Sequence, residues 1–244
     1  MVSATRREGL GMEQLVRAHT RLAAVPYVPE IRLHLAPAEE QDTVFGLWER
    51  TGDLPYWAYA WAGGQALARH VLDHPELVRG RTVLDLASGS GLVAVAAAVA
   101  GAAAVVANDI DPHAAAAIAL NARANGAAVT VRRGDILATT PREDVVLVGD
   151  AFYDAALAER VTPFLLRARP APDDQAPDRD TAGTGAARET PDGREAAGRT
   201  VLVGAPERAC SYLPRRLFRP VGVHLVPAVL EDVPYKRTTI WHLM

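Results

Sequence analysis

The stretch from Arg81 to Gly126 constrains the fold of this chain more than any other. It reads RTVLDLASGSGLVAVAAAVAGAAAVVANDIDPHAAAAIALNARANG. A short apolar run at 82–86 leads into a turn of small residues at 87–91. Good helix formers occupy 92–100, and Gly101 can end that helix. The pattern predicts a strand, a tight turn and a helix.

The second half of the stretch continues the alternation. Another apolar run, 104–107, is closed by Asn108 and Asp109. Asp111 and Pro112 suit the N-cap and first turn of a helix, which we expect to end at Gly126. A strand, a glycine turn, a helix, a strand and an acid in this order predict the opening of a nucleotide-binding parallel sheet.

The turn at 87–91 has the chemistry of a ligand site. Gly89 and Gly91 lack Cβ atoms, so a ligand can approach the backbone closely. The first amides of the following helix have no partner inside it and can bind an anion. Asp109 follows Gly89 by roughly twenty residues, the spacing expected for an acid that accepts ribose hydroxyls. It should lie at a strand tip, where ligands of such sheets bind.

Two kinds of cofactor suit this geometry. The run GSGLVA at 89–94 satisfies the loose fingerprint of dinucleotide-binding proteins. Asp85, an acid inside the first strand, points to a different family. It resembles motif I of class I S-adenosylmethionine-dependent methyltransferases, in which this acid helps to hold the methionine amino group of the cofactor. Ala87 stands where that motif usually has its first glycine, whereas Gly89 and Gly91 are intact.

Composition bounds the class of protein. The chain has 244 residues, 49% of them hydrophobic and 23% charged, as expected for one globular domain with a substantial core. A formal charge of −3 argues against a nucleic-acid partner. The apolar run at 92–107 is shorter than the roughly 18 residues of a membrane span, so we expect no membrane partner. The single cysteine suits a reducing compartment, and we expect a cytoplasmic protein. The histidines form no tight ligand cluster, which predicts no metal.

Three parts of the chain differ in character. Residues 1–27 are expected to form an amino-terminal extension, with a frayed start and an amphipathic helix at 12–22. Residues 28–244 are expected to form the main domain. Within it, the stretch at 169–199 is dense in Pro, Gly and charge and has no aromatic residue, which predicts a disordered surface insertion.

The rest of the main domain predicts further strands. Apolar or alternating runs indicate strands at 128–132, 145–149, 200–204, 221–226 and 238–243, with a short helix at 206–213. Two closing strands without a long helix between them resemble the terminal antiparallel pair of class I methyltransferases. We therefore expect an α/β fold: a Rossmann-like seven-strand class I methyltransferase sheet with helices on both faces and a C-terminal antiparallel strand pair.

An aromatic stretch precedes the glycine turn. The run LPYWAYAWAGGQAL at 54–67 holds four aromatic residues. Large aromatic side chains usually serve core packing. Aromatic faces also attract cations such as a sulfonium. The position directly upstream of the turn favours the second interpretation.

Longer pieces of the sequence resemble one methyltransferase family. This family is the electron transfer flavoprotein β-subunit lysine methyltransferases and their bacterial relatives. The resemblance runs from Val28 to the carboxyl end, except for the insertion, and Trp-x-Gly-Gly-Gln and Asn-Asp-Ile-Asp-Pro are its most specific parts. The matching pieces are VPEIRLHL, PYWAYAWAGGQAL, RGRTVLDLASGSG, ANDIDPHAAAAIALNA, VLVGDAFYD, TVLVGAPER and TTIWHL.

This resemblance implies a role for each matching residue, with S-adenosylmethionine as the cofactor. Asp85 would hold the methionine amino group, and Asp109 the ribose hydroxyls. The remaining cofactor-binding positions would be Ser88, Gly89 and Gly91 at the methionyl and ribose portions, Asp135 and Ile136 at the adenine, and Trp61 and the Gly149 backbone at the border of the site. Asp135 also suits an ordinary turn.

The residues after 149 would carry the reaction. Asp150 to Tyr153 occupies the place of the Asn/Asp-Pro-Pro-Tyr/Phe motif of many N-methyltransferases but lacks its prolines. We expect Asp150 to orient a lysine amine and Tyr153 to line its channel. The plainer alternative for Asp150 is an N-cap of the next helix.

Three functions remain open at this point. The first is methylation of a protein lysine, with the electron transfer flavoprotein β subunit as the expected substrate. The second is methylation of a small amine, because related sequences resemble nicotinamide N-methyltransferases. The third is a cofactor-binding module without catalysis.

Overall fold

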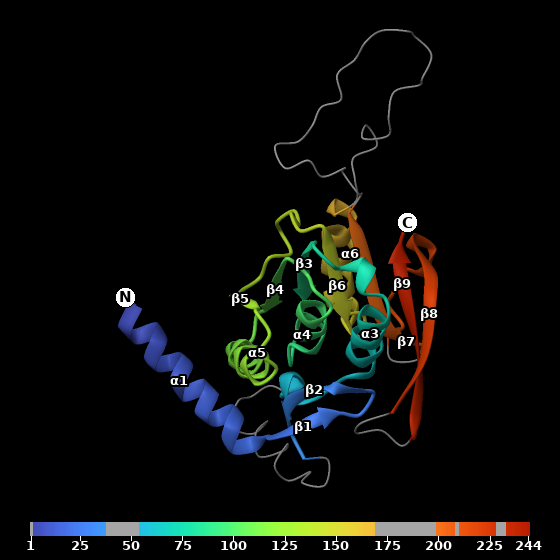
Figure 1. Cartoon of the computed structure of the whole chain (residues 1–244). Coiled ribbons are helices and arrows are strands. Elements are labelled where there is room, and N and C mark those ends of the chain that lie inside the picture. The colour runs from blue at the N-terminus through green and yellow to red at the C-terminus, as the bar shows by residue number, and fades with distance from the viewer. Residues whose placement is uncertain (1, 38–53, 169–198, 208–209, 228–232) are drawn as a thin grey trace.

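The computed structural model describes residues 2–37, 54–168, 199–207, 210–227 and 233–244. Its centre is a seven-stranded sheet in the order β5-β4-β3-β6-β7-β9-β8 (Figure 1). The first five strands in this order are parallel. Their bounds are β3 Thr82–Leu86, β4 Ala104–Asp109, β5 Thr130–Arg133, β6 Val145–Gly149 and β7 Thr200–Pro206.

The sheet closes with an antiparallel pair. Strand β9, Tyr235–Leu243, pairs antiparallel with β7, and β8, Phe218–Pro227, pairs antiparallel with β9 at the edge. In the sheet β9, the last strand of the chain, lies between β7 and β8. This is the strand order of the class I methyltransferase sheet. The predicted fold class is therefore confirmed, terminal pair included.

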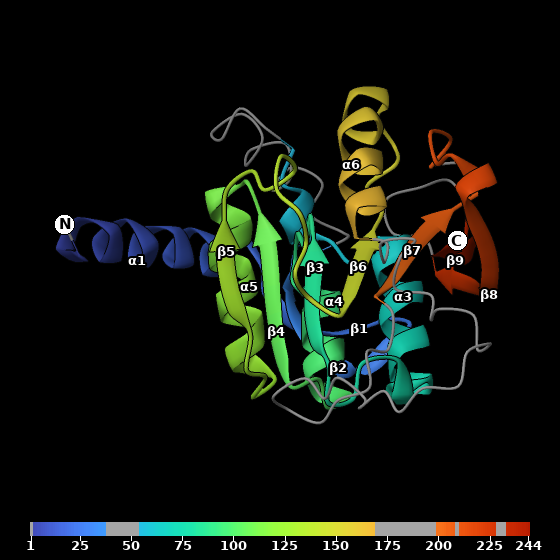
Figure 2. The same ribbon diagram turned by 90° about the horizontal axis from the view of Figure 1, so that it is seen from above.

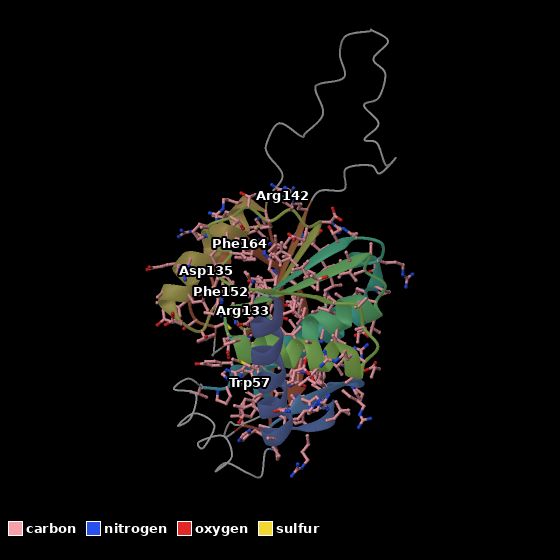
Figure 3. The ribbon with its side chains drawn as sticks, turned by 90° about the vertical axis from the view of Figure 1, so that its left-hand side faces the viewer. Trp57, Arg133, Asp135, Arg142, Phe152 and Phe164 are labelled. Carbon is pink, nitrogen blue, oxygen red and sulfur yellow. The ribbon has the colours of Figure 1, made fainter. Side chains whose placement is uncertain are left out.

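Helices cover both faces of the sheet (Figure 2). Three lie on one face, α3 Ala62–Asp73, α4 Leu92–Val99 and α5 Pro112–Ala124, and α6 Ala155–Arg167 lies on the other. Leu67, Val83 and Val93 belong to the core under the first three helices. Phe152 and Phe164 belong to the core under α6, where Figure 3 shows them. Because both faces are covered, the central strands read as continuous apolar runs.

The predicted helix at 206–213 is wrong where the structure describes it. Pro206 ends β7 and pairs with Thr238 of β9, and the Glu207 amide donates to the Arg237 carbonyl. Pairing with β9 thus keeps the backbone extended as far as Pro206. A turn follows, and then a short 3₁₀ helix, η4, at Arg215–Leu217.

The amino-terminal part also differs from the sequence prediction. Helix α1 spans Val2–His19, so it begins earlier and ends sooner than the predicted helix at 12–22. Its end is set by Thr20, whose hydroxyl donates to the Val16 carbonyl. The chain then forms a hairpin of β1, Arg21–Val25, and β2, Val28–Leu35. The insertion predicted at 169–199 lies, except for Arg199, outside the described residues.

Two buried amides fix this hairpin to the helices. Asn121 on α5 accepts a hydrogen bond from the His34 amide at 2.7 Å. Gln65 on α3 accepts one from the Tyr27 amide at 3.1 Å. Both side chains are fully buried. Two 3₁₀ helices flank α3 in the chain, η1 at Tyr56–Ala58 and η2 at Pro75–Leu77.

The first turn of α3 lies against the ends of two strands, backbone on backbone. A Cβ atom on Gly63 would stand 2.4 Å from the Gly204 carbonyl oxygen and 2.6 Å from Asp150 Oδ2. A Cβ on Gly204 would stand 2.2 Å from the Gly63 oxygen. A Cβ on Gly64, in contrast, would meet nothing closer than Val93 Cγ2 at 4.0 Å. The small residues of the Trp-x-Gly-Gly-Gln piece thus position α3 at the carboxyl end of the sheet.

These two glycines make a matched pair for mutation. We expect Gly63→Ala to lower the free energy of unfolding by about 2–3 kcal/mol, because the new methyl group overpacks a backbone contact. Gly64→Ala should be neutral or stabilising by up to about 1 kcal/mol, because alanine favours the helix. Urea unfolding of both variants measures the difference. Equal effects would show that α3 can move away from the strands.

Candidate active site

The turn at 87–91 begins where β3 ends. In the sheet β4 lies on one side of β3 and β6 on the other, so the strand order reverses at this point, where ligands of such sheets bind. Ala87, Gly89 and Gly91 all have positive φ, at 53°, 55° and 83°. Ala87 therefore adopts the left-handed conformation that glycine would adopt more easily. Such strain in a non-glycine residue is typical of functional sites.

The glycines of the turn have different surroundings. Gly89 is half-buried, and the nearest atom to a Cβ placed on it would be the Tyr56 carbonyl oxygen at 4.0 Å. Gly91 is buried, and a Cβ on it would lie 3.2 Å from the Ile118 Cα of α5. Gly89 therefore leaves room for a ligand, whereas Gly91 permits close packing of α5.

Asp85 is a buried carboxyl group on β3. Only 1% of the residue is exposed, and its Oδ2 accepts hydrogen bonds from the Ser88 hydroxyl and from the Ala94 amide at 3.0 Å. Burial raises its pKa to about 7, against the two hydrogen bonds, which lower it. The charge of Asp109 raises the pKa further. Asp85 is thus an acid that changes its charge near neutral pH.

Asp109 binds the same turn from the end of β4. Its Oδ2 accepts a hydrogen bond from the Gly89 amide at 2.8 Å, and its Oδ1 accepts one from the Asp111 amide at 3.0 Å. Burial raises the pKa of Asp109, while these amides lower it. Two carboxylates from neighbouring strands therefore meet on a single turn. The structure brings together Asp85, Ser88, Gly89 and Asp109, as the sequence predicts.

Asp150 directly follows β6, just as the glycine turn directly follows β3. Its backbone has a φ of 53°, and its Oδ2 accepts a hydrogen bond from the Gly64 amide at 2.8 Å. The N-cap of α6 is Asp154, which accepts from the Leu157 amide. The plainer interpretation of Asp150 as the cap of the next helix is therefore wrong. Asp150 instead joins the end of β6 to the start of α3.

Four aromatic rings form one group that links the loop after β6 with the segment before α3. Tyr153, after β6, stacks on Tyr56 of η1 with ring centroids 5.7 Å apart. Tyr56 also packs against Trp61 at 5.9 Å, and Trp61 in turn packs against Tyr59 at 5.6 Å. The Trp61 indole donates to the Tyr56 carbonyl at 2.8 Å. Tyr153 and Trp61 thus lie in one group with Tyr56, close to Gly89.

Burial raises the pKa of Tyr153 to about 12, and the neighbouring Tyr56 and the charges of Asp154 and Asp109 also raise it. The hydroxyl of Tyr153 therefore stays protonated at neutral pH.

Asp135 and Ile136 lie farther along the carboxyl end of the sheet. Asp135 is exposed and forms an ion pair with Arg160 of α6, which lowers the pKa of Asp135. Figure 3 shows Asp135 beside α6. Ile136 is buried. In this structure the Asp135 carboxylate pairs with Arg160 of α6 and accepts a hydrogen bond from the Leu137 amide at 2.9 Å.

Residues 66–149, which include the turn and both carboxylates, match the family of ribosomal protein L11 methyltransferase (PrmA). The electron transfer flavoprotein β-subunit lysine methyltransferase of Rattus norvegicus is 44% identical over 138 residues, 54% of this chain and 52% of that protein. The Homo sapiens protein of the same name is 42% identical over 148 residues, 57% of this chain and 54% of that protein.

This chain is similar to the electron transfer flavoprotein β-subunit lysine methyltransferases. The resemblance stated from the sequence is therefore confirmed. The chain spans about half the length of these curated relatives. Among solved structures, the ribosomal protein L11 methylase of Lactobacillus delbrueckii subsp. bulgaricus is 17% identical with a TM-score of 0.45, over 75% of this chain and 79% of that one. The fold assignment rests on the strand order and not on this last similarity.

Three residues of the site were not assigned by the sequence. Tyr56 lies in the aromatic stretch, but nothing in the pattern singled it out. Asn108 is buried, and its side-chain amide donates to the Arg132 and Gly134 carbonyls. The backbone carbonyl of Asn108 accepts from the Ser88 amide. Asn121 donates to the Ser90 carbonyl at 2.8 Å. For Asn108 and Asn121 the available signal was an amide side chain inside an apolar stretch, because a buried amide needs hydrogen-bond partners.

The described part of the chain offers neither a metal cluster nor a membrane-spanning helix. No group of three or more His, Cys, Asp or Glu residues there could hold a metal ion. No helix there combines the length and apolar character needed to cross a membrane.

The raised pKa of Asp85 predicts a pH-dependent stability. A carboxyl group with a folded-state pKa of about 7 and an ordinary value of 3.8 contributes stability below about pH 4. That contribution is lost as the pH rises through 7. We expect the wild type to lose up to roughly 4 kcal/mol relative to Asp85→Asn between about pH 4 and about pH 8.

Urea unfolding of both proteins across this pH range measures the difference. The comparison with the asparagine variant removes the contribution of the other titrating groups. Parallel curves would show that Asp85 ionises in the folded protein as it does in water.

Proposed function

We propose that this chain is an S-adenosylmethionine-dependent methyltransferase that acts on the amine of a protein lysine, with the electron transfer flavoprotein β subunit as the substrate. One observation carries the proposal: Asp85 and Asp109 hold the same glycine turn from adjacent strand ends. A ligand with a cationic amine and a ribose needs two acids in this relation. The similarity to the lysine methyltransferases supports the nature of the acceptor.

The residues around the turn fit the cofactor. Ser88 and Gly89 are partly exposed, and the space in front of Gly89 is open to 4.0 Å. Asp85 would neutralise the methionine ammonium, and a cation beside it would favour the charged carboxylate. Asp109 would accept the ribose hydroxyls. Gly91 would act indirectly, through the packing of α5 that fixes the turn.

Other residues would border the cofactor. Trp61 presents a ring within the aromatic group, which suits a neighbouring cationic sulfur. The Gly149 backbone lies at the end of β6, against the Gly64 backbone. Asp135 and Ile136 would contact the adenine. In this role the carboxylate of Asp135 would bind the adenine and Arg160 at the same time.

S-adenosylmethionine supplies a methyl group activated by its positively charged sulfur. The protein must present a neutral amine in line with that methyl, and most of this task is placement. A free lysine amine has a pKa of about 10.4, so the site must favour loss of a proton. Asp150 would accept hydrogen bonds from the amine, since its carboxylate is fixed by the Gly64 amide. Tyr153 would line the channel with a neutral ring and hydroxyl.

The cytoplasmic location and the domain boundary at residue 28 stay predictions. The structure pairs β1 with β2 across that boundary.

Asp150→Asn isolates the charge of the proposed orienting group. Asparagine tolerates positive φ, and its amide oxygen can still accept from Gly64, so the fold should persist. We expect kcat to fall roughly tenfold or more, because the amine loses its charged acceptor. The dissociation constant of S-adenosylhomocysteine should stay within about twofold. Undiminished turnover would remove Asp150 from the mechanism.

A labelled-methyl assay tests the function itself. Methyl-labelled S-adenosylmethionine is incubated with the purified chain and a recombinant electron transfer flavoprotein β subunit, and we expect label on lysine of that protein. Asp109→Asn should weaken S-adenosylhomocysteine binding roughly tenfold, because it removes a charged acceptor for the ribose hydroxyls. Asp73→Asn, at a surface ion pair with Arg69, serves as the control.

The other two functions predict different results when the chain and the labelled cofactor are added to a host extract. Label only in small solutes of a host extract would indicate a small-molecule N-methyltransferase. Cofactor binding without label anywhere would indicate a module without catalysis. Absence of S-adenosylhomocysteine binding would reject the cofactor site.

A further inference from the structure

Exposed large apolar side chains gather at the carboxyl end of the sheet. Leu54, Tyr56, Ile110 and Tyr153 are 38%, 44%, 71% and 45% exposed. They come from the segment before α3 and from the loops after β4 and β6. We call these four residues the apolar rim. Apolar side chains that cluster in the open mark interaction surfaces, whereas single ones need no explanation.

Contacts make the rim continuous with the candidate site. The Tyr56 amide donates to the Leu54 carbonyl at 2.8 Å, and the Tyr56 ring stacks on Tyr153. The Tyr56 carbonyl faces Gly89, whose amide binds Asp109. Ile110 is the next residue after Asp109. The rim is therefore connected to the turn at two points, through the Tyr56 carbonyl beside Gly89 and through Ile110 next to Asp109.

The backbone under the rim is held in place. Trp57, the neighbour of Tyr56, is 1% exposed and stacks on His113 of α5 with ring centroids 6.2 Å apart. Figure 3 shows Trp57 on the side of α5, away from Phe164. The Trp61 indole fixes the Tyr56 carbonyl. A surface ordered before binding loses less entropy when a partner docks.

Carboxylates lie between and beside the members of the rim. Asp109 and Asp111 flank Ile110, and Asp154 follows Tyr153. The side chain of Asp111 is 34% exposed, and Asp154 is exposed. An apolar surface with this negative charge complements a segment that carries both apolar side chains and a lysine cation.

We infer that the apolar rim is the docking surface for a protein segment that carries the acceptor lysine between apolar residues. This inference rests on the proposed function and names the partner of the same site. A small amine would reach the inner residues without covering Ile110 or Leu54. A protein segment would remove all four apolar side chains from water, which favours binding.

Ile110→Ser is the sharpest probe, because a side chain that is 71% exposed contributes little to folding. The acceptors are the recombinant electron transfer flavoprotein β subunit and Nα-acetyl-lysine amide. We expect the KM for the protein to rise roughly five- to thirtyfold relative to the KM for the small amine. Tyr56→Ser should shift the ratio in the same direction.

Leu225→Ser supplies the matched control. Leu225 is 62% exposed on the edge strand β8, which stands three strands from β6 in the sheet. We expect its ratio of KM values to stay within about twofold of the wild type. Thermal unfolding of every variant shows that the fold is kept.

Several results would overturn the inference. If Ile110→Ser changed both KM values equally, or matched the wild type, the rim would not dock a protein. If the wild-type chain formed a dimer that Ile110→Ser dissociates, the rim would be a contact between two copies of the chain. A wild type that methylates the protein while Ile110→Ser leaves the ratio of KM values unchanged would reject docking alone. A wild type that methylates only the small amine, or neither acceptor, would reject the proposed function as well.

Discussion

Two carboxylates hold one turn, and the rest of the carboxyl end is arranged around that contact. Asp85 reaches the turn from β3 through the Ser88 hydroxyl, and Asp109 reaches it from β4 through the Gly89 amide. Asp85 is fully buried and Asp109 is partly buried, which raises the pKa of each. Burying two acids beside one another is costly for a protein. A cationic ligand that binds there would offset the cost, which gives the arrangement a functional reason.

A second contact brings the other half of the site to this turn. The first turn of α3 lies directly on the ends of β6 and β7, and Asp150 accepts from the Gly64 amide. The aromatic segment just before α3 is thereby placed over the glycine turn, with Tyr56 beside Gly89. Methyl transfer depends on placement more than on strong acids or bases. Close backbone packing, which only glycine permits, is a physical means to that placement.

Much of the fold could be predicted because its signals are local. The apolar runs, the glycine turn and the Asp111-Pro112 helix start lie within one stretch, and Asp111 caps α5 as expected. The errors fell where distant contacts decide the local structure. Pro206 stays extended because β9 pairs with it, although the sequence suits a helix start. The start of β1 at Arg21 depends in the same way on its partner strand β2.

The sequence by itself determined the order of strands and helices, the glycine turn, and the spacing of Asp85 and Asp109 around it. These depend on residue types and short separations, which a chain carries before it folds. Only the tertiary structure decided that Asp150 binds α3 rather than capping α6, that Tyr56 stacks on Tyr153, and that Asn121 joins the hairpin to the turn. The partners in these contacts lie tens of residues apart, so they meet only after the sheet has set the register of its strands.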